Sequence, residues 1–371
     1  MAPMTPMTRL VALAVAVAAL VSAPRAAGAQ GPLVQGVADV ELWKTDDGST
    51  LLARNEGRVA PLARLNLWAA WELPAGLTLY ALGEAEAGPA VEEAELEVEQ
   101  AGVRWAPSRR VVLDAGMLAS PVGGFAGRRL SNRNPLVGAP DGYPVTYPIG
   151  AQLSGVLGAL DWRAAAVSLP VTSEKYAPEP TARMRPAVAL GLTPATGLRL
   201  GASWTEGAYL NDGLPDELLA GREWCDYRQR LGGIELQASR GYVELWAEAA
   251  WSEYELPGAA QPLRGTTAYV EARYTFGPRL YAAMRAERND YPYIQVESGA
   301  WDASNADVRD VEAAIGFRPA SHQVVKLSVR RDVWDVSRDQ RAYLPDGYAV
   351  AFQFSQSFDV LSLVDRARGV R

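Results

Sequence analysis

The chain of 371 residues carries a formal net charge of −7 and contains one cysteine, Cys225, and one histidine, His322. This composition excludes an intrachain disulfide, a CxxC metal site and a CxxCH haem site, and it offers no basic surface for nucleic acid. We therefore expect no cofactor, no metal site and no nucleic-acid partner.

Residues 1–29 have the pattern of a secretory signal peptide. Arg9 supplies the positive charge, residues 10–23 form the apolar segment, and the small residues 27–29 form a cleavage site. The apolar segment is shorter than the ~20 residues that a transmembrane helix needs. Cleavage removes two of the 36 basic residues and none of the 43 acidic ones, so the net charge of the mature chain becomes −9.

Tight turns and long polar connections alternate over residues 30–358. Each tight turn carries Pro or Gly, or both, where a hairpin must reverse. The turns lie at residues 74–76, 107–109, 158–161, 193–197, 239–241, 276–278 and 319–321, and the long connections are centred near residues 47, 88, 134, 175, 215, 258, 298 and 339. These connections imply about sixteen strands of about ten residues each.

An even number of antiparallel strands, with short turns at one end and long loops at the other, is typical of a transmembrane β-barrel. Closure of the sheet leaves no unpaired strand edge in lipid. The short turns are then expected to face the periplasm and the long loops the cell exterior. A soluble β-sandwich would show the same alternation within strands but would not require this rhythm of connections.

Apolar and polar residues alternate within the expected strands. In residues 267–276, Val270 and Tyr274 lie on one face, and Glu271 and Arg273 lie on the other. The pattern continues in residues 280–287, 311–318 and 325–330. It predicts that one face contacts lipid and the other a water-filled lumen.

The expected strand over residues 91–105 carries an acidic column. Glu93, Glu95, Glu97 and Glu99 lie on one of its faces. Like charges in a row are unfavourable unless water or counter-ions screen them. The column therefore predicts a solvated lumen wall rather than a packed core.

The last expected strand covers residues 348–358 and ends in Phe358. Its alternating apolar residues and final aromatic resemble the C-terminal signature of outer-membrane proteins, which the insertion machinery reads. Residues 359–371 continue beyond this aromatic, so either the last strand ends later than residue 358 or a short periplasmic tail follows it.

Residues 120–148 form the third long loop. A Gly-x-x-x-Ser-Pro-x-Gly motif at residues 116–123 opens it, and Asn-Pro at 134–135 and Tyr-Pro at 147–148 follow. With its sixteen-strand count the chain resembles the porin superfamily, and this loop resembles that of phosphate-selective O/P porins. The resemblance implies that the loop folds into the barrel and narrows a channel, and that the protein forms a homotrimer.

Charged residues are expected at this constriction and on the wall around it. Where a channel narrows, rings of arginine favour anions and rings of carboxylate favour cations. The loop supplies Arg128, Arg129, Arg133 and Asp141, and the wall supplies Arg273, Arg285, Lys326 and Arg330 in addition to the acidic column. Phosphate-selective porins carry lysines along the lumen, whereas residues 30–371 contain only Lys44, Lys175 and Lys326. A solvated surface position is the alternative for each loop arginine.

These features predict a porin of the bacterial outer membrane, surrounded by lipid, through which small hydrophilic solutes or ions diffuse passively. One alternative is a closed structural barrel in an envelope complex, with opposed charges filling its lumen. A less favoured alternative is an outer-membrane hydrolase that uses Ser321 and His322. No Gly-x-Ser-x-Gly elbow accompanies this pair, so we do not expect an enzyme.

Overall fold

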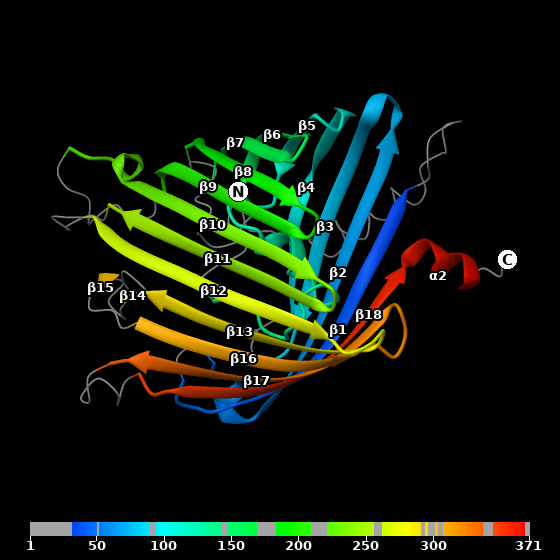
Figure 1. Ribbon diagram of the computed structural model, residues 1–371, viewed down its shortest axis with the longest axis vertical. Helices are drawn as coiled ribbons and strands as arrows, with labels where there is room; N and C mark the ends of the chain where they lie inside the picture. The colour runs from blue at the N-terminus through cyan, green and yellow to red at the C-terminus, as the bar shows by residue number, and fades with distance from the viewer. Residues whose placement is uncertain are drawn as a thin grey trace.

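The computed structural model describes residues 32–49, 52–89, 94–141, 147–168, 183–209, 221–255, 262–290, 294–295, 301–302, 307–336 and 344–367. Sixteen antiparallel strands close into one barrel (Figure 1), which confirms the predicted fold. They are β1 (Leu33–Thr45), β2 (Val59–Leu73), β3 (Leu77–Ala87), β4 (Glu95–Ser108), β5 (Val111–Met117), β6 (Ile149–Leu157), β7 (Leu160–Val167), β8 (Arg185–Ala195), β9 (Leu198–Ala208), β10 (Arg228–Arg240), β11 (Val243–Tyr254), β12 (Leu263–Thr275), β13 (Leu280–Asp290), β16 (Asp307–Phe317), β17 (Gln323–Asp335) and β18 (Gly347–Asp359). The expected signal peptide lies outside the described residues.

Short elements occupy several connections between the barrel strands. β14 (Ile294–Gln295) and β15 (Trp301–Asp302) pair with each other in the connection between β13 and β16. The described connections contain the 3-10 helices η1 (Asn55–Gly57), η2 (Pro74–Gly76), η3 (Phe125–Arg128) and η4 (Trp224–Asp226). Among the described residues, no helix has the length and apolar character needed to cross a membrane.

The seven predicted tight turns join neighbouring strands and alternate with the eight predicted long connections. Local chemistry explains why the chain reverses there. In the β8–β9 turn, for example, Gly197 has φ +79°, and a Cβ at this position would lie 2.4 Å from the Ser239 carbonyl oxygen. Only glycine fits both requirements. We refer to the two ends of the barrel as the short-turn end and the long-loop end.

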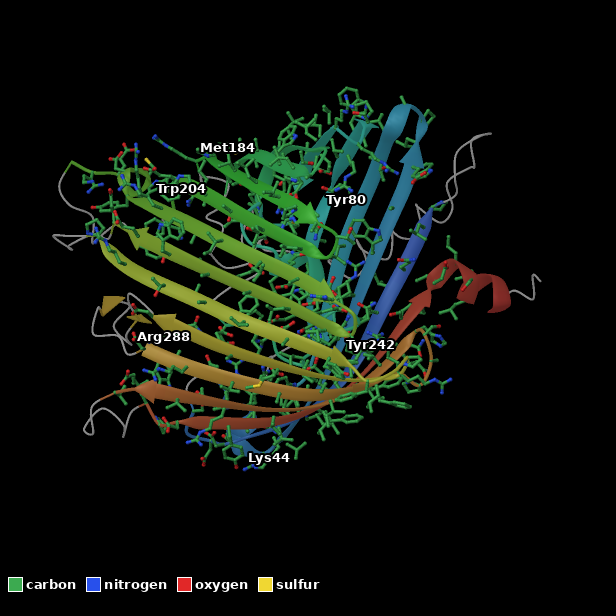
Figure 2. All side chains as sticks on the ribbon, viewed as in Figure 1. Lys44, Tyr80, Met184, Trp204, Tyr242 and Arg288 are labelled. Carbon is green, nitrogen blue, oxygen red and sulfur yellow. The ribbon has the colours of Figure 1, made fainter. Side chains whose placement is uncertain are left out.

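The two faces of the strands follow the predicted alternation. On the outer face, Val270 and Leu327 are 50% and 54% exposed, while Glu271 and Ser328, their neighbours in the chain, point inward and are buried. Figure 2 shows Tyr242 at the short-turn end of this outer face and Trp204 toward the long-loop end. An apolar outer band with aromatic residues toward its ends and a polar interior is the pattern of a barrel in lipid.

A β-bulge in β4 interrupts the alternation that the sequence predicts for this strand. Leu82 of β3 pairs with Gln100 and Gly83 pairs with Val98, so Glu99 is an extra residue. Glu99 and Gln100 consequently both face the lumen, and the inward positions shift by one residue from there on. Trp105 has an odd number, like the residues of the acidic column, and would face the lumen without the bulge. It lies instead on the outer face and is 43% exposed.

A helix follows the last strand. β18 ends at Asp359, one residue beyond the predicted end, and α2 (Val360–Ala367) occupies much of the segment predicted as a periplasmic tail. The Ser362 backbone N–H donates to the Asp359 side chain at 2.9 Å, which caps the helix. The α2 helix contacts β1 and β18 at the short-turn end (Figure 1).

Candidate functional site

The loop between β5 and β6 crosses the lumen, as its two neighbouring arginines show. Arg128 forms an ion pair with Glu271 on β12, whereas Arg129 forms one with Glu84 on β3, 3.1 Å away. Seven steps along the strand order separate β3 from β12 in this barrel of sixteen strands. Adjacent loop residues therefore reach almost opposite walls.

Arg128 is held in an acidic and aromatic part of the wall. Its Nη2 donates to the Tyr269 hydroxyl at 3.1 Å, and its guanidinium carbon lies 4.7 Å from the centre of the Trp246 ring. Burial lowers the pKa of Arg128, but its charge interactions and hydrogen bonds with Glu271 and Tyr269 together raise it by more, so the net pKa lies above the ordinary arginine value. Arg128 is thus a compensated charge that anchors the loop.

Arg129 is compensated in the same way on the opposite wall. Besides Glu84, it forms an ion pair with Glu99, the buried bulge residue of β4. Its Nη2 also donates to the Asn66 side chain at 3.3 Å. The bulge therefore has a structural consequence for the loop, because it brings a second carboxylate to Arg129.

Arg133 differs from the other two loop arginines. Its side chain is exposed in the lumen, and one of its N–H groups donates to the Gly127 carbonyl oxygen within the loop at 3.2 Å. No ion pair of Arg133 is found within the described part of the chain. The three arginines grouped together by the sequence therefore separate into two anchors and one solvent-exposed charge.

Three of the four predicted basic wall residues lie beneath the loop rather than in open water, namely Lys326, Arg285 and Arg330. Lys326 is 1% exposed and donates to the carbonyl oxygens of Ser131 and Leu136 at 2.6 and 2.9 Å. Arg285 donates to the Gly138 and Ala139 carbonyl oxygens at 3.1 and 2.8 Å. This corrects the expectation that they face lumen water: loop carbonyls taken out of water require donors, and these side chains supply them.

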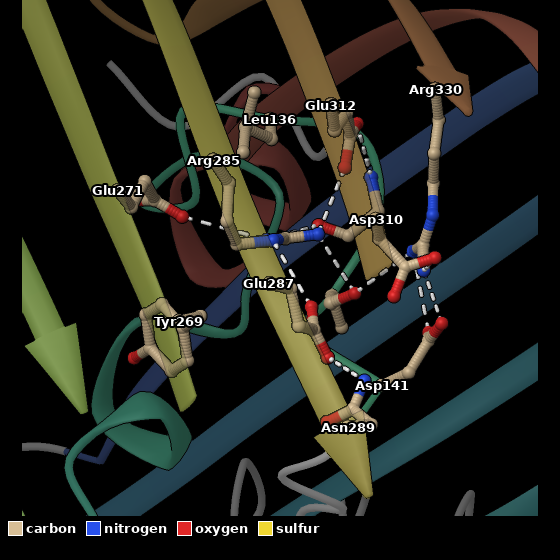
Figure 3. Close-up of polar contacts among 12 residues, drawn as sticks. Leu136, Asp141, Tyr269, Glu271, Arg285, Glu287, Asn289, Asp310, Glu312 and Arg330 are labelled. Atoms are coloured by element: carbon tan, nitrogen blue, oxygen red, sulfur yellow. Dashed lines mark hydrogen bonds and ion pairs between the residues drawn. The ribbon is translucent and has the colours of Figure 1, made fainter. Parts of the chain in front are cut away.

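Arg330 and Arg273, the basic wall residues not yet described, also form ion pairs. Arg330 binds Asp141 of the loop through two hydrogen bonds, and its Nη2 lies 3.3 Å from Asp310 (Figure 3). Arg273 forms an ion pair with Glu244 and remains partly open to the lumen. Asp141 therefore acts in the structure as a partner of the wall, not as an isolated acidic charge.

Two loop glycines allow the backbone to reach wall carboxylates. The Gly124 N–H donates to Glu248 at 3.0 Å, and the Gly138 N–H donates to Glu312 at 3.0 Å. A Cβ at Gly124 would lie 2.4 Å from a carboxylate oxygen of Glu235, and one at Gly138 would lie 2.8 Å from Glu312. A Cβ at either position would push that carboxylate aside, so glycine lets the backbone approach the wall without displacing it.

The acidic column of β4 lies on the lumen side as far as the structure describes it. Glu95 is exposed, Glu97 is half-buried and Glu99 is fully buried, while Glu93 lies outside the described residues. Glu95 and Glu97 pair across the strands with Glu86 and Glu84 of β3, so the column is one side of a wider acidic wall.

Arg64 on β2 is the main basic residue of this wall that sequence reasoning missed. It lies 2.8 Å from Glu86, 3.7 Å from Glu84 and 3.4 Å from Glu41. The inward phase of β2 could have indicated it, because Arg64 alternates with apolar residues there. The acidic wall therefore carries its own basic residue in addition to the loop arginine that it binds.

The loop separates two cavities inside the barrel. A cavity of about 450 Å³ on the long-loop side is lined by residues of both charges, among them Arg54, Arg64 and Asp141. A cavity of about 800 Å³ on the short-turn side is lined by Arg133 and by many uncharged polar residues. Arg129 lines both cavities. The transition between them therefore lies at this side chain.

Three carboxylates form a compact group in the wall beside the loop. Asp141, Glu287 and Asp310 offer ligand atoms within 4.8 Å of one another, the spacing that a hard divalent cation needs. Arg330 already places a positive charge against Asp141 and Asp310. The group is therefore at least partly compensated by protein.

The lone cysteine and histidine occupy positions of different character. Cys225 lies in the long connection before β10, and its side chain is buried in η4. His322 lies in the turn between β16 and β17 and lines the short-turn cavity. Its backbone carbonyl oxygen accepts a hydrogen bond from the Ser357 N–H at 2.8 Å.

The comparisons with known proteins place this chain by its fold. No protein-family model and no curated protein match it. Among solved structures, the chain is similar to the anion-selective porin from Comamonas acidovorans, with a TM-score of 0.59 at 10% identity over 88% of this chain and 99% of that one.

Two solved structures of OmpT, an outer membrane protein of Vibrio cholerae, are also similar. The loop L8 deletion mutant has a TM-score of 0.56 at 11% identity, and the trimer form has a TM-score of 0.53 at 11% identity. Each comparison covers 88% of this chain and 99% of the other chain. At these identities the similarity shows the architecture that all of them share, that of an outer-membrane β-barrel.

Proposed function

We propose that this protein is a porin of the bacterial outer membrane that lets small hydrophilic solutes or ions diffuse passively. The apolar outer band suits contact with lipid, and the polar interior suits water. The similarity to an anion-selective porin agrees with this function. The short turns of the barrel face the periplasm and the long loops face the cell exterior. Transport of this kind requires no cofactor and no catalytic step.

The constriction is the loop over residues 120–148. The observation that carries this assignment is that Arg129 lines the cavities on both sides of the loop. Wall cations hold the loop by its carbonyl groups, and wall carboxylates hold it by its arginines and N–H groups. A loop fixed from both sides sets a constant pore size.

Charge selectivity depends mainly on Arg133. Arg128 and Arg129 are compensated by wall carboxylates, so their charges contribute little to the field in the pore. Arg133 is exposed and biases the pore toward anions, because fixed charge is poorly screened where a channel narrows. We do not propose phosphate specificity, because the ammonium group of Lys326 donates to loop carbonyl oxygens and is not exposed to a solute.

A homotrimer is the proposed assembly. The trimer form of OmpT shares this architecture, and the wide apolar outer face offers surface for contact between copies. Sedimentation of the purified protein in detergent, with detergent density matched, tests the assembly. A mass of one chain would exclude it.

A closed structural barrel is the second candidate, and the dense pairing of lumen charges with the inserted loop favours it. Osmotic swelling of liposomes that contain the folded protein separates the two functions. A porin lets monosaccharides enter and excludes larger oligosaccharides, so swelling rates fall steeply with solute size. Swelling no faster than that of empty liposomes, for every solute, would support the closed barrel and overturn the porin.

A further inference from the structure

A row of lumen side chains crosses four neighbouring strands on the short-turn side of the loop. Gln35 of β1 pairs with Trp68 of β2, Trp68 pairs with Leu82 of β3, and Leu82 pairs with Gln100 of β4. Residues directly paired across antiparallel strands share a face, and three strand spacings make the row about 14 Å long. All four residues line the cavity of about 800 Å³.

The bulge at Glu99 completes this row. Without the extra residue, Gln100 would point outward, because the acidic column places odd-numbered positions of β4 toward the lumen. With it, two glutamines flank an apolar centre made by Trp68 and Leu82. The bulge therefore positions a polar group, a role that bulges often have beside functional sites.

Trp68 is fixed as an aromatic platform. Tyr80 stacks on it with ring centres 5.6 Å apart and an angle of 20° between the rings, and Arg104 lies 5.8 Å from the Tyr80 ring (Tyr80 is labelled in Figure 2). Trp68 lines the cavity, whereas Tyr80 is not among the lining residues and contacts Trp68 through the stacked ring. An aromatic face carries negative potential that attracts the weakly positive C–H bonds of an aliphatic ring.

Amides are the commonest polar side chains in the lining of this cavity. Five amide side chains contribute, namely Gln35, Asn66, Gln100, Asn132 and Gln356. Gln35 and Gln100 make no side-chain hydrogen bond within the described part of the chain. An amide offers both donors and acceptors, which matches hydroxyl groups, because each hydroxyl also donates and accepts.

The charge of the cavity is positive on the loop side. Arg133 is exposed there and uses one of its N–H groups within the loop, so the others are available to a solute. Among the described residues, Asp359 is the one carboxylate that lines the cavity, and it caps α2. Arginine binds a carboxylate through two parallel hydrogen bonds. A small inorganic anion would use Arg133 but neither the aromatic platform nor the amides.

We infer that this cavity is a binding subsite for a monosaccharide-sized sugar acid, with its ring on Trp68, its hydroxyls on Gln35 and Gln100, and its carboxylate toward Arg133. The subsite rests on the proposed porin function and identifies the class of solute that the pore favours. It lies directly after the constriction, where a solute that has passed Arg129 meets it.

Titration calorimetry of the folded protein in detergent tests the subsite without requiring transport. Glucuronate, glucose and acetate are the probes. We expect glucuronate to bind with a Kd of about 1 mM and glucose roughly tenfold more weakly, because glucose lacks the charged contact. Acetate is expected to show no saturable binding. Equal affinity for acetate and glucuronate would make this a plain anion site and overturn the inference.

Three variants assign the contacts. Arg133→Gln is expected to weaken glucuronate binding about tenfold and leave glucose binding unchanged. Trp68→Ala is expected to weaken both sugars about fivefold. Trp204→Ala is the matched control, because this tryptophan lies on the outer face and should leave both affinities unchanged. Equal effects of Trp68→Ala and Trp204→Ala would overturn the assignment of the platform.

Channel recordings of the same preparations separate this inference from the porin function. Conductance without glucuronate binding would overturn the subsite and leave the porin intact. Glucuronate binding by a protein that forms no channel would support the subsite and overturn the porin.

Discussion

Replacing Arg128 by Gln tests how strongly the loop is anchored to the wall. The substitution removes one partner of an ion pair whose carboxylate, Glu271, is fully buried. Breaking a buried pair from one side costs about 3–5 kcal/mol, because the remaining charge is left uncompensated. Glu271 keeps Arg285 at 3.5 Å, so we expect a loss of about 3 kcal/mol in the free energy of unfolding, the low end of this range. The folding equilibrium constant then falls roughly a hundredfold.

The assay is a denaturant titration of the protein in lipid vesicles, followed by tryptophan fluorescence. The double variant Arg128→Gln with Glu271→Gln leaves no unpaired charge, so it should recover most of the loss. Arg133→Gln is the matched control, since an exposed arginine should change the free energy of unfolding by less than about 0.5 kcal/mol. Equal losses for Arg128→Gln and Arg133→Gln, or strictly additive effects in the double variant, would refute the buried-anchor reasoning.

Three further predictions concern the faces, the charge and the orientation of the barrel. Val270→Arg should cost about 2–4 kcal/mol of unfolding free energy in vesicles, because the residue faces lipid. Gln35→Arg, at an exposed position on the lumen face, should cost less, and equal costs would show the faces to be wrongly assigned. Arg133→Gln should move the reversal potential in a salt gradient toward cations without changing stability, and an unchanged potential would place Arg133 outside the conduction path. In a protein whose Cys225 has been replaced, a membrane-impermeant thiol reagent applied to intact cells should label Ala53→Cys, which lies in a long loop, but not Ser321→Cys, which lies in a tight turn. The reverse result would show that the barrel has the opposite orientation in the membrane.

Local rules explain why the sequence predicts the barrel so completely. A period of two residues fixes which face of a strand meets lipid, and turn residues fix where hairpins reverse. Both signals lie within a few residues of the feature that they determine. The tight turn at Gly197 and the outward position of Val270 can therefore be predicted from the sequence without knowing which strands pair.

The arrangement of the site is harder to predict from the sequence, because it depends on contacts between residues that are far apart in the chain. Arg128 and Glu271 are 143 positions apart, and no local pattern distinguishes Arg128 from the exposed Arg133. Periodicity places Lys326 on the lumen face, but it does not reveal that the loop covers it. The bulge at Glu99 is a property of how two strands pair, so the alternation of one strand alone does not show it.

The proposed pore is an open lumen that the loop over residues 120–148 narrows. The ends of the loop are adjacent, since the Leu118 N–H donates to the Pro148 carbonyl oxygen at 2.9 Å, so residues 119–147 can be replaced by a short glycine linker without moving β5 or β6. The most direct measurement is single-channel conductance in planar bilayers for the wild type and this deletion variant. We expect the wild type to conduct and the deletion variant to conduct more. A silent wild type, or equal conductance of the two proteins, would contradict this proposal.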